Sequence, residues 1–187
     1  MTLCIGIKNG DTIELASDRL LTNSHGDPFS KFFIHEGTFV VGSGNADFAQ
    51  YFLSAVQEHS PKFKDVIDVV DFGMMFYKSL SIPLSTASEY GSFLIAQQGR
   101  LFRLCSVCEI ADVNTRFAIG SAARVGLTCL DMGQTIPQTM LYASKVSGDV
   151  GNGFDHITIQ PDGSYAHTIF NSVERHEWIQ TTNVQAV

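Results

Sequence analysis

Residues 1–20 read MTLCIGIKNGDTIELASDRL and indicate how the chain begins to fold. Residues 3–8 alternate like a half-buried strand, and residues 12–17 do so again. Asn9-Gly10 between them is a strong signal for a tight turn. The sequence therefore predicts an opening β-hairpin, which returns Asp18 to a position beside the first residues.

Further strand and helix patterns follow in blocks. Lys31 begins the extended segment KFFIH, which Glu36-Gly37 connects to a second strand at 38–41. A glycine-rich segment, 42–45, then precedes a helical repeat of apolar residues, and Asn45 is a suitable N-cap. Later strands are expected at 92–97, 100–105, 117–119, 154–160 and 164–170, and later helices at 66–80, 122–130 and 137–146.

The order of these elements predicts the fold class. Pairs of helices separate runs of antiparallel strands, and no linker, repeat or low-complexity stretch interrupts residues 1–187. Such an order suits two stacked antiparallel sheets with helices on each outer face. We therefore expect one domain, an α+β protein with a four-layer α-β-β-α sandwich.

The bulk composition restricts the partners. The chain has 187 residues, 44% of them hydrophobic, and a formal charge of −7 from 12 basic and 19 acidic residues. This balance argues against general nucleic-acid binding, which needs a basic surface. No apolar run approaches a membrane span, and the N-terminus lacks the pattern of a signal peptide. We expect a cytoplasmic protein that does not bind membranes.

Cysteine and histidine do not form a recognisable metal pattern. Cys105 and Cys108 make a lone CxxC motif with no second pair to complete a zinc site, and they lie in a segment that alternates like a strand. A metal or redox role therefore competes with ordinary half-buried thiols. The six histidines lack a spacing such as HExxH. We expect neither a metal nor a cofactor.

Thr2 is the residue with the most direct chemical potential. Methionine aminopeptidase removes Met1 when a small residue follows, which would place a free α-amine and a hydroxyl on Thr2. An α-amine with a pKa of about 8 can accept the hydroxyl proton, so one residue supplies nucleophile and base. The alternative is that Met1-Thr2 is an ordinary translation start.

Motifs along the whole chain resemble the proteasome β-subunit family of N-terminal-nucleophile hydrolases, which includes bacterial HslV and Anbu. Thr2 with ASDRL resembles the family's opening threonine and Ala-x-Asp segment, with Asp18 at the family's spacing of 16 positions after Thr2. Lys31 matches the family's lysine. The segments VVGSGNADFA, FAIGSAARVG and DVGNGFDHITIQPDGS resemble three later family motifs in the same order.

The resemblance implies roles for three further residues. Lys31 would lower the proton affinity of Thr2, and Asp18 would hold the lysine ammonium in place. The alternative for this pair is an ordinary structural ion pair. The Ser43 backbone N–H is the implied oxyanion donor, from the match of GSGNAD; the alternative is a helix-entry loop.

Ser121 and Asp149 match positions that hold the N-terminal amine and its proton relay, with helix capping and turn formation as the alternative roles. Asn152 occupies a position where the family has serine, within Gly-Asn-Gly. Asparagine donates and accepts hydrogen bonds but cannot relay a proton as a hydroxyl does. This departure bears on the relay more than on the nucleophile.

Taken together, the resemblance implies a threonine endopeptidase subunit that assembles into a homo-oligomeric ring or helical rim and cuts peptides or unfolded proteins. An ATPase unfoldase is a plausible partner. Three alternatives stay open: an amidase or transpeptidase acting on small amides, a non-catalytic assembly subunit, and an unrelated binding domain in which Thr2, Asp18 and Lys31 do not converge.

Overall fold

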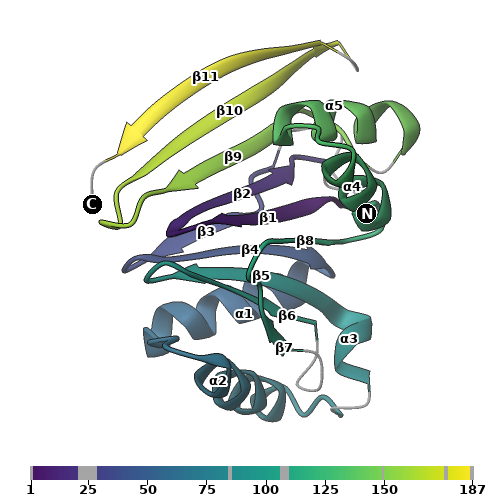
Figure 1. The fold of residues 1–187 in the computed structure, drawn as a ribbon. Coiled ribbons are helices and arrows are strands. Elements are labelled where there is room, and N and C mark those ends of the chain that lie inside the picture. Colours follow the sequence, from purple (N-terminus) through teal and green to yellow (C-terminus); the bar gives the residue numbers. More distant parts are fainter. Residues whose placement is uncertain are drawn as a thin grey trace.

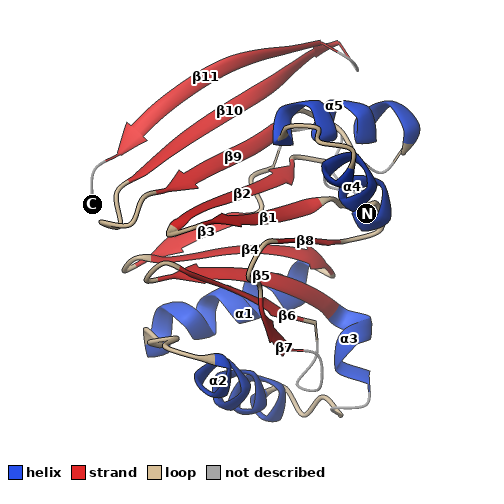
Figure 2. Ribbon diagram, viewed as in Figure 1, coloured by secondary structure: helices blue, strands red, loops and turns tan. Residues whose placement is uncertain are grey.

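A computed structural model describes residues 2–20, 29–83, 86–105, 110–148, 150–174 and 177–185. Within these residues, two antiparallel sheets lie face to face, and helices cover their outer faces (Figures 1 and 2). The predicted α-β-β-α sandwich is therefore confirmed.

The first sheet contains the chain's opening hairpin. Its strands follow the order β11-β10-β9-β2-β1-β8. They are β1 (Cys4–Asn9), β2 (Thr12–Asp18), β8 (Arg116–Ile119), β9 (Phe154–Ile159), β10 (Tyr165–Glu174) and β11 (Glu177–Gln185). Cys4 pairs with Ser17, as the predicted hairpin requires. β10 and β11 extend the sheet beyond residue 170, where the predicted closing hairpin ends.

The second sheet follows the order β3-β4-β5-β6-β7. Its strands are β3 (Phe32–His35), β4 (Thr38–Gly44), β5 (Gly91–Gln97), β6 (Arg100–Leu104) and β7 (Ile110–Asp112). β4 runs farther than the sequence predicts, because Ser43 pairs with Ser92 and Gly44 with Gly91. The glycine-rich segment before the first long helix is thus the end of a strand.

In the described part of the chain, five helices connect the strands: α1 (Ala46–His59), α2 (Val66–Ser79), α3 (Ala87–Tyr90), α4 (Ala123–Asp131) and α5 (Ile136–Val146). The predicted N-cap of α1 is confirmed, since the Asn45 side chain accepts from the N–H groups of Asp47 and Phe48. The sequence did not predict α3, which leads directly into β5. Among the described residues, no helix combines the length and apolar character needed to cross a bilayer.

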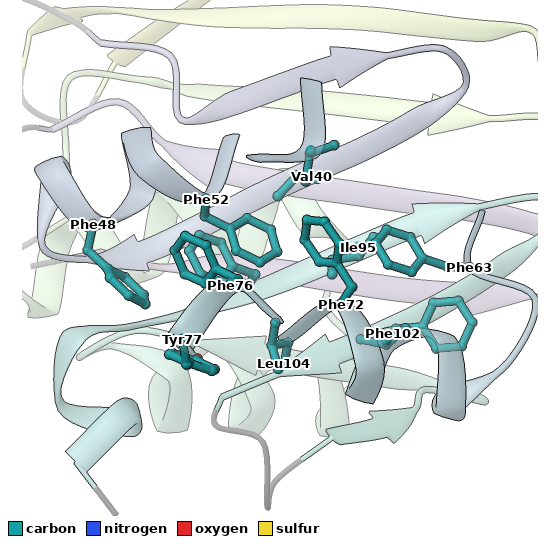
Figure 3. Close-up of a cluster of buried hydrophobic side chains, with 13 residues drawn as sticks. Val40, Phe48, Phe52, Phe63, Phe72, Phe76, Tyr77, Ile95, Phe102 and Leu104 are labelled. Carbon is teal, nitrogen blue, oxygen red and sulfur yellow. The ribbon is translucent and has the colours of Figure 1, made fainter. Parts of the chain in front are cut away.

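Three groups of buried side chains hold the layers together. One lies between the sheets and includes Leu15, Val41 and Ile157. A second joins the second sheet to α1 and α2 and is rich in aromatic rings (Figure 3). There the rings of Phe52 and Phe93 stack with their centroids 3.9 Å apart. The third joins the first sheet to α4 and α5 and consists mainly of aliphatic residues.

Candidate active site

Thr2 lies two residues before β1, beside the turn that precedes α4. It is 6% exposed, so only a small part of it reaches solvent. The hairpin brings the last residue of β2 alongside it: the Asp18 N–H donates to the Leu3 carbonyl at 3.2 Å. The local fold therefore places a carboxylate one residue away from Thr2, across the hairpin.

Lys31 connects this carboxylate to the threonine. Its Nζ donates to Thr2 Oγ1 at 2.7 Å and to Asp18 Oδ1 at 2.9 Å. Lys31 stands directly before β3 in the second sheet, so the two contacts bridge the two sheets. The structure thus brings together Thr2, Asp18 and Lys31, which contradicts the alternative of a binding domain in which they stay apart.

The ion pair is buried, with side-chain exposures of 9% for Lys31 and 0% for Asp18. Burial raises the pKa of Asp18 above its ordinary value, while Lys31 and two backbone N–H groups oppose that rise. These N–H groups belong to Leu3 and Leu20 and donate at 2.9 and 3.2 Å. These two backbone donors fix the position of the carboxylate, and the carboxylate in turn fixes the position of the lysine ammonium.

The turn between β8 and α4 packs against the Thr2 backbone. The Thr2 nitrogen donates to Ser121 Oγ at 3.3 Å, and the Ala122 N–H donates to the Thr2 carbonyl at 3.4 Å. Gly120 has a φ of +98°, and a Cβ there would lie 2.1 Å from the Thr2 carbonyl oxygen. Gly120 is therefore required for this close approach, a role that the sequence pattern did not reveal.

Ser43 borders the same space from β4. It is 8% exposed, and together with Thr2 and Gly44 it lines two cavities that adjoin the threonine. This position suits a group that contacts a substrate bound at Thr2. The assignment of its backbone N–H as an oxyanion donor stays a prediction.

The segment that contains Asn152 is tied to the end of β2. The Arg19 N–H lies 3.2 Å from both the Gly151 and the Gly153 carbonyl oxygens. Asn152 itself has a φ of +59°, a left-handed conformation that asparagine tolerates better than most residues. Asp149, the other predicted residue of this segment, lies outside the described residues, so its role stays a prediction.

Two cavities meet at Thr2. One has a volume of about 270 Å³ and is walled mainly by apolar residues, among them Leu20, Phe29, Phe32, Leu53 and Phe93. The other has a volume of about 530 Å³ and a more polar wall, which includes Asn45, Glu89, Ser92 and Ser121. An extended chain laid across Thr2 would therefore meet different chemistry on its two sides.

Cys4 is a second nucleophile type close to the site. Its Sγ lies 3.4 Å from Ser17 Oγ and donates to the Gly42 carbonyl at 3.4 Å. Burial raises the pKa of the Cys4 thiol to about 12. The thiol is therefore protonated at neutral pH and lies fully inside the sandwich, which makes it a poor nucleophile.

Comparison with solved structures identifies the same fold in other proteins. Thiobacillus denitrificans BPH in complex with epoxomicin superposes with a TM-score of 0.73 at 15% identity, over 85% of this chain and 98% of that one. Anbu, the ancestral beta-subunit from Yersinia bercovieri, gives a TM-score of 0.66 at 15% identity, over 92% of this chain and 88% of Anbu.

Eukaryotic HslV from Trypanosoma brucei gives a TM-score of 0.61 at 12% identity, over 85% of this chain and 99% of HslV. No protein-family model matches the sequence, and no curated protein does. Because Anbu and HslV are among the structural matches, the expected proteasome-like N-terminal-nucleophile hydrolase fold is confirmed. At these identities the similarity shows the fold, and the chemistry is argued from the site.

Proposed function

We propose that this chain is a threonine peptidase with Thr2 as its nucleophile after Met1 is removed. The observation that carries the proposal is the 2.7 Å contact between Lys31 Nζ and Thr2 Oγ1. A buried ammonium group on a hydroxyl oxygen stabilises the alkoxide and lowers the hydroxyl pKa. A purely structural lysine has no need of this hydroxyl, because Asp18 already neutralises it.

The α-amine of Thr2 would act as the base. The Thr2 nitrogen already contacts Ser121 Oγ at 3.3 Å, and this contact would orient the free amine. With a pKa of about 8, the amine is partly neutral at pH 7 and accepts the Oγ1 proton as the hydroxyl attacks. Asp149 and Asn152 are the proposed groups around this amine.

The attack would form an ester between Thr2 Oγ1 and the acyl half of the substrate. Backbone N–H groups at the end of β4, including that of Ser43, would stabilise the oxyanion. The amine would then give its proton to the departing nitrogen, which breaks the peptide bond. Water, deprotonated by the same amine, would hydrolyse the ester and regenerate Thr2. No metal or cofactor takes part in these proposed steps.

The fold shared with Anbu and HslV supports a proposal about assembly. We propose that copies of this chain form a homo-oligomeric ring or helical rim in the cytoplasm, and that the substrates are peptides or unfolded proteins. An ATPase that unfolds substrates is the proposed partner. Enclosing a peptidase in this way would restrict cleavage to chains that can enter.

Hydrolysis of an unfolded protein and of short peptide amides tests the proposal. We expect the protein that has lost Met1, and so begins at Thr2, to cut both. In Thr2→Ala the rate should fall on the order of a thousandfold or more. Cys4→Ala is the matched control, because it removes the neighbouring thiol and should retain activity. Epoxomicin, which is bound to the Thiobacillus BPH, is a suitable inhibitor to include.

One departure favours a second candidate, a non-catalytic assembly subunit. Asn152 stands where the resemblance implies a serine, and it cannot relay a proton. A protein that assembles but cuts neither substrate would support this candidate and contradict the peptidase. Cleavage of small amides alone would instead indicate an amidase.

A further inference from the structure

The two cavities that meet at Thr2 differ in chemistry, and the proposed mechanism determines which half of a substrate enters each one. In that mechanism, the Thr2 amine gives its proton to the departing nitrogen. The leaving half must therefore lie on the side of Thr2 where the amine is. The acyl half must lie on the other side.

The position of the amine follows from its contact with Ser121. The Thr2 nitrogen lies 3.3 Å from Ser121 Oγ, and both Ser121 and Gly120 line the larger, polar cavity. The smaller cavity contains neither of them and is walled by apolar residues from β3, α1 and β5. The departing nitrogen thus faces the polar cavity, and the apolar cavity receives the acyl half.

We infer that the polar cavity binds the residue after the cleaved bond and that Glu89 makes it select a cationic side chain there. This inference rests on the proposed peptidase function. Among the residues described around this cavity, Glu89 has the only charged side chain, and the remaining polar wall is formed by neutral side chains such as Asn45 and Ser92. A lysine or arginine side chain would therefore meet an opposite charge, and a glutamate would meet a like one.

Glycine backbone forms part of the wall of this cavity. Gly44 and Gly91 pair across β4 and β5, and both line the cavity, as does Gly120. A Cβ on Gly44 would lie 2.4 Å from the Tyr90 carbonyl oxygen, so a side chain is not accommodated there. At these three positions backbone alone forms the wall, and the cavity of about 530 Å³ has room for a long basic side chain.

The size of the effect follows from the exposure of Glu89. It is an exposed residue of α3, so water screens its charge. An interaction of this kind changes rates by about two- to fivefold. The preference should also shrink as salt is added, because the Debye length falls from about 10 Å at 0.1 M to about 3 Å at 1 M.

The test uses three peptides with one apolar acyl half and with lysine, glutamine or glutamate directly after the cleaved bond. We expect kcat/KM to decrease in the order lysine, glutamine, glutamate. In Glu89→Gln the three values should converge, and in Glu89→Lys the order should reverse. Glu58→Gln is the matched control, since it removes an equal charge from an exposed position in α1 and should preserve the order.

Acylation by a β-lactone separates this inference from the proposed function. The lactone ring opens without releasing an amine, so Glu89→Gln should be acylated at the unchanged rate if its fold and nucleophile are intact. Equal kcat/KM values for the three peptides in the unmutated protein would overturn the inference and leave the peptidase standing. Failure to cut any peptide, together with no acylation, would overturn both.

Discussion

Two buried carboxylates lie on neighbouring strands of the first sheet and invite comparison. Asp18 ends β2, and Asp155 lies in β9 opposite Ser17. Both are fully buried, and each has a basic partner: Lys31 at 2.9 Å for Asp18, and His167 at 2.9 Å for Asp155. By burial and pairing alone, the two sites look alike.

Their surroundings differ. Asp155 also lies 3.5 Å from Arg19 Nε, and Arg19 donates to Asn171 at 3.0 Å, so this group joins the end of β2 to β9 and β10. Lys31 instead contacts the Thr2 hydroxyl, beside two cavities. A buried ion pair is therefore weak evidence of a site, and the contact with a nucleophile distinguishes Asp18 and Lys31.

Replacing Lys31 should have the largest effect on activity. Lys31→Met removes the charge beside Thr2 Oγ1, so we expect kcat/KM to fall by about a hundredfold to a thousandfold or more. Peptide hydrolysis measures this loss, and thermal unfolding checks that the variant is folded. A folded Lys31→Met protein with near-normal hydrolysis would show that the pair of Lys31 and Asp18 is structural, like the ion pairs of Asp155.

Moving Thr2 without removing any charge should have the next largest effect. In Gly120→Ala the new Cβ would overlap the Thr2 carbonyl oxygen, so the turn or the threonine must shift. A displacement of 1 Å at a reacting group costs about a hundredfold in rate. We expect such a loss in kcat, with Gly133→Ala, at an exposed turn with nothing nearby, as the control. Unchanged kcat in Gly120→Ala would show that this turn does not position Thr2.

The Asp155 group should behave in the opposite way. Asp155→Asn leaves Arg19 without its counter-charge inside the protein, and we expect the free energy of unfolding to decrease by about 3 kcal/mol. Activity per folded molecule should stay within about twofold, because Asp155 does not contact Thr2. Denaturant unfolding and active-site titration separate the two quantities. A hundredfold loss of activity in folded protein would assign Asp155 to the site as well.

The pH dependence should reflect Asp18. Burial raises the pKa of Asp18 above its ordinary value of 3.8, so protonation in the folded protein begins at a higher pH than in the unfolded chain. As the pH falls through the folded pKa, Lys31 loses its counter-charge and kcat/KM should decrease. The effect on stability has the opposite sign. Because the folded protein holds the Asp18 proton more tightly than the unfolded chain does, the free energy of unfolding should decrease as the pH rises from 3.8 through the folded pKa.

Asp18→Asn should remove both pH effects. A pH–rate profile measures the first, and unfolding at several pH values measures the second. The Thr2 amine gives kcat/KM a decrease of its own below a pH of about 8, which Asp18→Asn should retain, and Asp18 should add a second decrease at lower pH. A second decrease that begins only at or below pH 3.8 in the unmutated protein would contradict a raised pKa for Asp18.

Local sequence predicted much of this arrangement, and the resemblance supplied its chemistry. Asn9-Gly10 predicted the hairpin that returns Asp18 to the N-terminus, and Asn45 predicted the start of α1. The role of Gly120 could not be predicted, because its neighbour Thr2 is remote in sequence and only the folded register brings them together. The same holds for Asp155 and Arg19, whose pairing depends on how β9 lies against β2.

The most direct test of Thr2 as the nucleophile is the intact mass of the purified protein before and after treatment with a threonine-directed β-lactone. We expect the untreated mass to lack Met1, and the treated protein to gain one adduct that Thr2→Ala does not gain. Cys4→Ala should gain the adduct normally. A chain that keeps Met1, or a trimmed chain that gains no adduct, would contradict Thr2 as the nucleophile.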